Sequence, residues 1–259
     1  MVIDNKITIV TGLWDIKRHE LTEGWSRSYE EHYIEKFAKL LEIPYNLIIF
    51  GDKELEEFVF KYRKKENTQF IVRPQSWFKG EFYDKIQEIR KDEKWIKQSG
   101  WLGESTQAKL DMYNPLVMSK PYLLHDAKIL DKFDSTHLFW LDAGITNTVH
   151  LGYFTHDKVL EKLHNIDKVT FLAFPYKAEN EIHGFNYKKM CDLTLSKVDK
   201  VCRGGFFGGP VDSLSDFNNQ YYNIMKRTLN EGYMGTEESL FSILIYKHSD
   251  LYQYFLIES

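Results

Sequence analysis

One carboxylate stands directly after an apolar run that has the length of a strand. In THLFWLDAGITNT, residues 136–148, the run His137–Leu141 leads to Asp142, followed by Ala143 and Gly144. A carboxylate on a rigid strand end can hold Mg²⁺ or Mn²⁺, because both ions prefer hard oxygen ligands. Gly144 would leave room for a diphosphate. The alternative is an ordinary turn, in which Asp bonds locally and Gly accepts a positive φ.

Four glycines surround two phenylalanines in VCRGGFFGGP, residues 201–210. Glycine permits unusual backbone angles and lets a ligand approach main-chain N–H groups closely, so this segment is a second candidate for substrate contact. It lacks the Lys-Ser/Thr ending of a P-loop and the spacing of a dinucleotide fingerprint, which excludes both of those sites. A bulged strand without a ligand is the alternative.

Two consecutive glutamates, Glu237 and Glu238, precede an apolar helical run in GTEESLFSILIYKH, residues 235–248. Carboxylates suit the first turn of a helix, and Thr236 is expected to cap it. A carboxylate held there can instead orient a hydroxyl, act as a base, or stabilise positive charge on an anomeric carbon. Both interpretations stay open.

The nine histidines show no metal-binding spacing such as HExxH. His183, in the predicted loop AENEIHGFN, is the preferred histidine for substrate contact, and His248 is a candidate for approaching a metal. Cys191 and Cys202 are too few for a disulfide scaffold or a cysteine-rich zinc site. The chain also lacks a GxSxG elbow, so a covalent hydrolase is not supported.

The elements that must position these residues alternate in the first part of the chain. Apolar runs predict strands at 7–14, 46–50 and 69–72, and helical periodicity predicts helices at 28–41 and 53–64. This βαβαβ order indicates a parallel sheet with helices on both faces. Since ligands of such sheets bind at the carboxyl ends of strands, Thr11 and Gly12 join the candidate site.

The rest of the chain is more mixed. A mainly helical stretch over 82–132, interrupted at Gly100–Gly103 and at Pro115 and Pro121, is followed by further elements. These are predicted strands at 137–141, 169–174, 201–207 and 252–257, and predicted helices at 213–230 and 236–248. We expect one α/β domain over residues 1–259, with a mostly parallel central sheet flanked by helices. Its nucleotide-binding half is expected over 1–144 and its acceptor-binding half over 145–259.

Composition restricts the classes of partner. Hydrophobic residues make up 43% and charged residues 28% of the chain, which suits a folded domain. The net charge of -4 argues against a nucleic-acid partner. With no secretion signal and no long apolar stretch, we expect a soluble, cytoplasmic protein without a transmembrane segment. The aromatic content of 15% fits an aromatic-rich core or a cleft that stacks on sugar rings.

At these segments the sequence resembles the HtrL/YibB family of bacterial and viral proteins, which are regarded as glycosyltransferase-like. The resemblance rests on ITIVTGLWDI, the segment with Trp25, Arg27 and Tyr29, NPLVMSKPYLL, FWLDAGI, EIHGF, GGFFGG and EESLF, in order over nearly the whole chain. The last three blocks are also similar to the retaining blood-group galactosyltransferase family, in which a D-x-D strand end, an A/G-x-FGG segment and an acidic pair before Ser follow one another. This implies a GT-A fold, which is Rossmann-like.

The resemblance also implies a role for each matching position. Val10 and Thr11 are expected to contact the nucleotide base and Lys120 to reach the diphosphate, while Asp142 stands at the first carboxylate of D-x-D. The donor-binding set is then Val10, Thr11, Gly12, Arg27, Lys120, Asp142, Ala143 and Gly144. His183, Gly204 and Gly205 are expected to bind the acceptor. Glu238, with Glu237 beside it, is the expected catalytic residue.

Gly144 departs from the family pattern, because it stands where the second carboxylate of D-x-D belongs. Mn²⁺ or Mg²⁺ is expected at Asp142, but with one carboxylate the ion can rely on phosphates and water, recruit another ligand, or be absent. In the last case, Lys120 or Arg27 can partly neutralise the diphosphate.

The sequence therefore predicts a glycosyltransferase that moves a hexose from UDP-glucose or UDP-galactose to a saccharide or another hydroxyl acceptor. Retention follows if Glu238 faces the anomeric carbon, and inversion follows if it deprotonates the acceptor. A non-catalytic sugar-binding protein with a degenerate transferase fold is the alternative. A hydrolase or phosphoryl-transfer enzyme would need further carboxylates around Asp142, which the sequence does not place.

Overall fold

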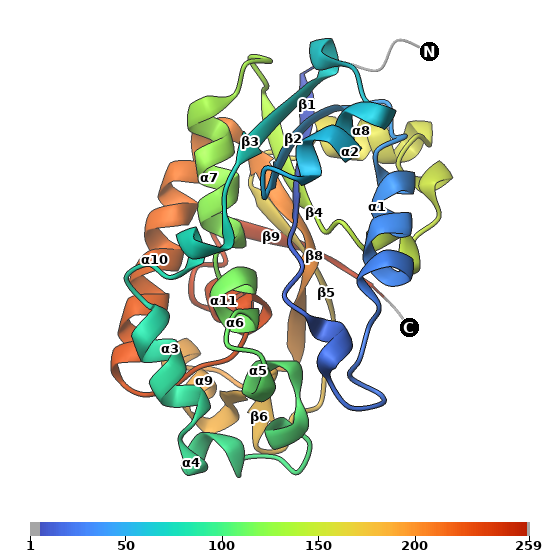
Figure 1. Ribbon diagram of the computed structural model, residues 1–259. Helices are drawn as coiled ribbons and strands as arrows, with labels where there is room; N and C mark the ends of the chain where they lie inside the picture. The colour runs from blue at the N-terminus through green and yellow to red at the C-terminus, as the bar shows by residue number, and fades with distance from the viewer. Residues whose placement is uncertain (1–5, 258–259) are drawn as a thin grey trace.

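A seven-stranded sheet forms the centre of the computed structural model, which describes residues 6–257 (Figure 1). The strand order is β3-β2-β1-β4-β8-β5-β9. These strands are β1 Ile7–Leu13, β2 Asn46–Gly51, β3 Thr68–Val72, β4 His137–Leu141, β5 Val169–Pro175, β8 Lys200–Pro210 and β9 Tyr252–Leu256. A separate hairpin pairs β6 Glu181–Ile182 with β7 Phe185–Asn186.

The first four strands in chain order are parallel to one another, and the others make the sheet mixed. Strand β1 pairs in parallel with β2 and β4, and β2 with β3. Strand β8 runs antiparallel to both β4 and β5, whereas β9 is parallel to β5. The prediction of a mostly parallel α/β sheet with a mixed second half is therefore confirmed.

Helices cover both faces of this sheet (Figure 1). On one face, α1 Glu35–Leu40, α2 Leu55–Tyr62 and α8 Asp157–His164 contribute to the core. The other face packs against α3 Tyr83–Arg90, α7 Lys120–Leu130, α10 Leu214–Asn230 and α11 Glu237–Lys247. The remaining helices, α4 Glu93–Ile96, α5 Thr106–Lys109, α6 Tyr113–Val117 and α9 Tyr187–Thr194, are short.

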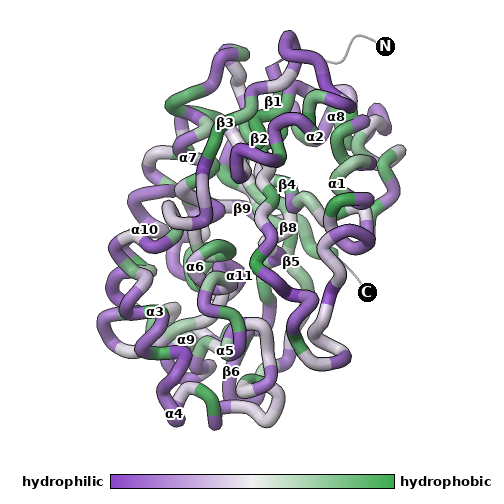
Figure 2. Tube along the Cα trace, in the orientation of Figure 1, coloured by the Kyte–Doolittle hydropathy of each residue, from purple (hydrophilic) through white to green (hydrophobic). Residues whose placement is uncertain are grey.

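The two cores explain why the strands lack polar alternation. Successive side chains of a strand point to opposite faces, and here both faces are covered, so both must be apolar. In β4, for example, Leu138 and Trp140 join one core, and Phe139 and Leu141 join the other. Figure 2 shows apolar residues gathered along the central strands and polar residues over the outer helices.

Two local features differ from the predicted elements. The helix expected over 28–41 begins with a π-helical turn, Glu30–Ile34, before α1 starts. The predicted helical region 82–132 is divided into several helices, as expected, but Pro115 lies inside α6 and Pro121 at the start of α7 rather than between helices. No helix within residues 6–257 combines the length and the apolar character that crossing a membrane requires.

Candidate functional site

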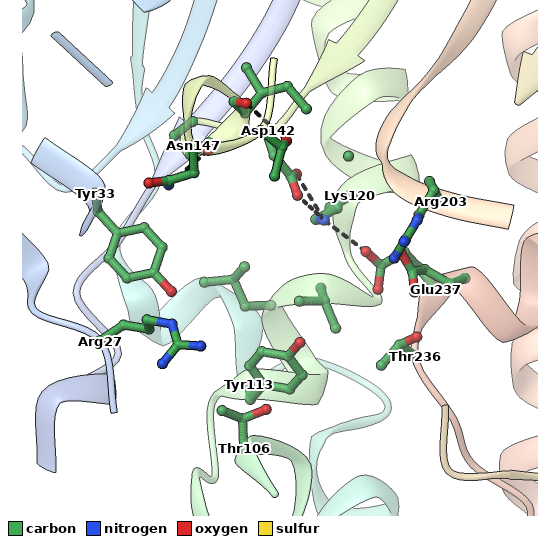
Figure 3. Close-up of a pocket in the computed structure, with 18 of the residues that line it drawn as sticks. Arg27, Tyr33, Thr106, Tyr113, Lys120, Asp142, Asn147, Arg203, Thr236 and Glu237 are labelled. Atoms are coloured by element: carbon green, nitrogen blue, oxygen red, sulfur yellow. Dashed lines mark hydrogen bonds and ion pairs between the residues drawn. The ribbon is translucent and has the colours of Figure 1, made fainter. Parts of the chain in front are cut away.

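A cleft of about 1300 Å³ opens beside the carboxyl end of β4. Most of the residues singled out in the sequence line it: Gly12, Arg27, Lys120, Asp142, Ala143, Gly144, His183, Gly205, Glu237 and Glu238. Figure 3 shows four of them, Arg27, Lys120, Asp142 and Glu237, which come from segments far apart in the chain. The acidic strand end, the Gly-rich segment and the glutamate pair therefore meet at one site.

Lys120, the first residue of α7, is the centre of the polar network in this cleft (Figure 3). Its Nζ lies 2.8 Å from Oδ1 and 3.0 Å from Oδ2 of Asp142. It also donates to Glu237 Oε1 at 2.7 Å and to the Gly204 carbonyl at 3.3 Å. Since only 7% of the Lys120 side chain is exposed, this ammonium group is held by the protein rather than by solvent.

Asp142 is fixed from both its backbone and its side chain. Its N–H donates to the Gly205 carbonyl at 3.0 Å, which continues the β4–β8 pairing beyond the strand end. The Trp140 indole donates to Asp142 Oδ1 at 2.7 Å. The carboxylate is thus held in place on the cleft wall, with 36% of the side chain exposed.

The glutamate pair at the start of α11 reaches across to other elements. Glu238 Oε1 accepts the Gly204 N–H at 2.8 Å, and Glu238 Oε2 lies 3.2 Å from His183 Nδ1. Glu237 is buried and binds Lys120. Thr236 is the N-cap residue of α11, as expected, but its hydroxyl makes no capping bond and has no hydrogen-bond partner among the described residues. The two carboxylates therefore organise the cleft rather than only the helix end.

Burial and neighbouring charges shift the pKa values of two of these groups. Burial alone would lower the pKa of Lys120, but the carboxylates of Asp142 and Glu237 outweigh it, and the pKa rises. Burial raises the pKa of Glu237 to about 7, against the lowering effect of Lys120, and the Glu238 carboxyl adds to the rise. The two pKa values rise for different reasons: two carboxylates stabilise the charged form of Lys120, whereas burial disfavours the charged form of Glu237.

The two adjacent glycines of β8 serve different purposes. A Cβ at Gly204 would overlap the Glu237 carboxyl group, so glycine is needed there for Glu237 to reach Lys120. Gly204 does not itself line the cleft. A Cβ at Gly205 would lie 3.8 Å from Asp142 Oδ2, and this glycine forms part of the cleft wall.

His183 adopts a backbone conformation that is unusual for its residue type. Its φ of 51° lies in the left-handed region, and Gly184 after it has a φ of 88°. Such angles cost free energy and often occur at ligand-binding positions. While Nδ1 faces Glu238, Nε2 is buried without a hydrogen-bond partner in the described structure.

Besides Gly204, three candidates from the sequence do not line the cleft. Val10 and Thr11 are fully buried in β1, so their contact with a nucleotide base stays a prediction, whereas Gly12 reaches the cleft wall. His248 follows α11 and packs its ring against Tyr252. It is not among the cleft residues.

Aromatic and basic residues to which the sequence assigned no role also line the cleft. Trp25 and Trp101 stack with ring centroids 5.9 Å apart, and the Trp101 indole donates to Glu181 Oε1 at 3.1 Å. Arg203 lies with its guanidinium 4.3 Å from the Phe174 ring centroid. The position of Trp101 between Gly100 and Gly103, where the helical pattern breaks, was the available signal.

The side chains around Asp142 do not fit a divalent ion. Within residues 6–257, no group of three or more His, Cys, Asp or Glu could hold a metal. Both Asp142 oxygens already face the Lys120 ammonium, and Gly144 offers no second carboxylate. The other nearby carboxylate, Glu237, binds the same lysine. The donor set therefore does not support the Mn²⁺ or Mg²⁺ expected at Asp142.

The fold is shared with a solved fungal enzyme structure. Core-mannan synthase A (CmsA/Ktr4) from Aspergillus fumigatus, in its Mn/GDP form, superposes with a TM-score of 0.53 at 10% identity, over 96% of this chain and 72% of that chain. Mouse xyloside xylosyltransferase 1, apo form, gives a TM-score of 0.46 at 8% identity, over 96% and 84% of the two chains. The first superposition supports the GT-A-like fold.

Comparison with known protein families supports the resemblance seen in the sequence. No curated protein sequence matches this chain. The model of the HtrL_YibB family, described as a bacterial protein of unknown function, matches residues 5–258. The chain therefore belongs to the HtrL/YibB family.

Proposed function

We propose that this chain is a glycosyltransferase that moves a hexose from a nucleoside diphosphate sugar, a UDP-sugar, to a hydroxyl group of a saccharide. The observation that supports this most is the meeting of Lys120, Asp142 and the Glu237–Glu238 pair in one cleft, at the carboxyl end of β4. Ligands of open α/β sheets bind at such an edge.

Basic side chains on the cleft wall suit the diphosphate. Arg18 and Arg27 line the cleft, and neither forms an ion pair with a carboxylate of the described residues. Arg18 donates to the Tyr33 hydroxyl at 3.0 Å, and Arg27 donates only to nearby carbonyls. Figure 3 shows Arg27 and Tyr33 across the cleft from Lys120. A guanidinium group can donate two parallel hydrogen bonds to phosphate oxygens, so these arginines can hold the donor's diphosphate.

In the proposed reaction, the bond between the anomeric carbon and the diphosphate oxygen breaks, and its electron pair goes to the diphosphate. The acceptor oxygen bonds to the anomeric carbon, and its proton goes to a diphosphate oxygen. Glu238, fixed by the Gly204 N–H and His183, stabilises the positive charge that develops on the carbon, and the product retains the donor's configuration. Proton NMR of the product's anomeric signal tests retention.

Binding of nucleotide sugars tests the proposed function directly. Calorimetric titration with UDP-glucose, UDP-galactose and GDP-mannose should detect at least one ligand, and the bound donor should be hydrolysed slowly even without an acceptor. Affinity without any turnover of the donor, across a panel of saccharide acceptors, would favour the non-catalytic sugar-binding protein. If no nucleotide sugar binds, the proposed function is wrong.

The stacked tryptophans are proposed to bind the acceptor sugar. Trp101→Ala should raise the acceptor KM about three- to tenfold, because stacking on an aromatic ring contributes about 0.5–1.5 kcal/mol. Donor affinity should not change. Trp77→Ala is the matched control, since Trp77 is 36% exposed against 37% for Trp101 but does not line the cleft. Equal effects of the two substitutions on the acceptor KM would contradict this assignment.

The pKa of Glu237 predicts how donor affinity changes with pH. Because this pKa is about 7, Glu237 gains negative charge between about pH 6 and pH 8, while the diphosphate of a UDP-sugar keeps its charge. The protonated carboxyl leaves more of the Lys120 charge to the diphosphate, so affinity should be about tenfold tighter at the lower pH. Binding should then take up protons, as calorimetry in buffers of different ionisation enthalpy can measure. Glu237→Gln should remove the dependence, and tighter binding at higher pH would contradict it.

A further inference from the structure

The Lys120 ammonium faces both oxygens of Asp142, where an ion bound by both of them would lie. Its Nζ is within 3.0 Å of both Asp142 oxygens, and a Mn²⁺ or Mg²⁺ ion would need one of these oxygens at about 2.0–2.3 Å. Ion and ammonium would then repel each other at close range in a largely buried setting. The bound ammonium therefore disfavours a divalent ion at this carboxylate.

All the hydrogen-bonding capacity of this amine is used by the folded chain. An ammonium group has three N–H donors, and Nζ has three acceptor groups: the Asp142 carboxylate, Glu237 Oε1 and the Gly204 carbonyl. These acceptors belong to β4, α11 and β8. The amine is therefore a built part of the site and not a mobile surface lysine that could leave for a metal.

Among residues 6–257, no second carboxylate stands at the D-x-D position beside Asp142. The Trp140 indole already donates to Oδ1. At Gly144, φ is -89°, which any residue could adopt, so the missing carboxylate does not follow from backbone strain. An ideal Cβ there would lie 3.3 Å from the Asn147 side-chain nitrogen, which donates to the carbonyls of Gly144 and His32. A neutral amide thus stands beside the position of the second carboxylate.

We infer that this chain binds and uses its nucleotide sugar without a divalent ion, and that the fixed positive charge of Lys120 on the cleft wall attracts the donor's diphosphate in the ion's place. The inference rests on the proposed function. When the bond to the anomeric carbon breaks, the negative charge that develops on the diphosphate meets this fixed ammonium and the arginines of the cleft wall. The step needs no further reactant.

Chelation tests the inference on the unmodified protein. Affinity for the UDP-sugar, measured by calorimetry, and turnover, measured as release of UDP, should differ by less than about twofold between excess EDTA and excess Mn²⁺. Electron paramagnetic resonance should show that the protein, with or without UDP, removes no free Mn²⁺ beyond what UDP alone removes.

Gly144→Asp supplies the comparison for the metal titration. If Gly144→Asp takes up Mn²⁺ and the unmodified chain does not, the lack of a carboxylate at position 144 explains why the unmodified chain works without a metal ion. If neither takes it up, Lys120 excludes the ion even beside two carboxylates, which also supports the inference. Loss of UDP-sugar affinity or turnover in EDTA, restored by Mn²⁺, would overturn it. Absence of any nucleotide-sugar binding in both conditions would instead refute the proposed function, and the inference with it.

Discussion

Lys120→Met is expected to lower turnover by about 10²–10³-fold, the usual cost of removing one donor that stabilises charge in a transition state. The methionine side chain fills similar space but carries no charge, so the diphosphate loses its nearest fixed cation. Donor affinity should fall as well, because the positive charge of Lys120 is proposed to attract the diphosphate before and during transfer. Initial rates with saturating donor and calorimetric titration measure the two effects.

Lys120→Met should also destabilise the fold, so its effect on stability has to be separated from its effect on turnover. It leaves Asp142 and the buried Glu237 without their shared cation, and removing one partner of a buried ion pair costs about 3–5 kcal/mol. The double variant Lys120→Met, Glu237→Gln removes the more buried uncompensated charge and should recover much of the free energy of unfolding without recovering turnover.

Lys128→Met is the matched control on the same helix. Lys128 also lies on α7, donates to Ser215 Oγ at 2.7 Å and is outside the cleft, so its replacement should leave affinity and turnover unchanged. Wild-type turnover in a folded Lys120→Met variant would show that this ammonium is not needed for transfer.

Glu238→Gln is expected to lower turnover by about 10²–10⁴-fold while donor affinity changes little. Glutamine has nearly the shape of glutamate, and its Oε1 can still accept the Gly204 N–H, so the wall of the cleft is kept. What is lost is the negative charge that is proposed to stabilise the anomeric carbon. Comparison of donor binding with donor hydrolysis separates the two properties.

Glu231→Gln provides the control for loss of a carboxylate elsewhere. Glu231 pairs with Lys189 and Arg227, away from the cleft, and its replacement should not affect turnover. Full turnover in Glu238→Gln would remove this residue from the catalytic set. An unmodified chain that binds the donor but never turns it over would support the non-catalytic alternative.

The sheet could be predicted from the sequence because its strands are short, apolar and separated by clear helical periodicity. The antiparallel direction of β8 could not, since hydrophobic pattern carries no information about strand direction. The helix predicted over 28–41 has the right position, but the π-helical turn at its start leaves no separate mark in the apolar spacing.

Site residues could be predicted where a local sequence pattern marks them. Asp142 stands at a strand end, Gly205 in a glycine-rich run and Glu238 in an acidic pair, and all three line the cleft. The contact between Lys120 and Glu237 has no such signal, because the two residues are 117 positions apart. The stacking of Trp25 on Trp101 depends in the same way on tertiary packing.

The hydrogen-bond acceptors of Lys120 come from both halves of the chain, so the polar network of the cleft cannot form in either half alone. A fragment ending at residue 144 would keep Lys120 and Asp142 but lose Glu237 and the Gly204 carbonyl, which the second half supplies. Such a fragment would expose an amine that the complete chain keeps enclosed. Separately expressed halves should therefore be inactive, and activity should return only if they reassemble.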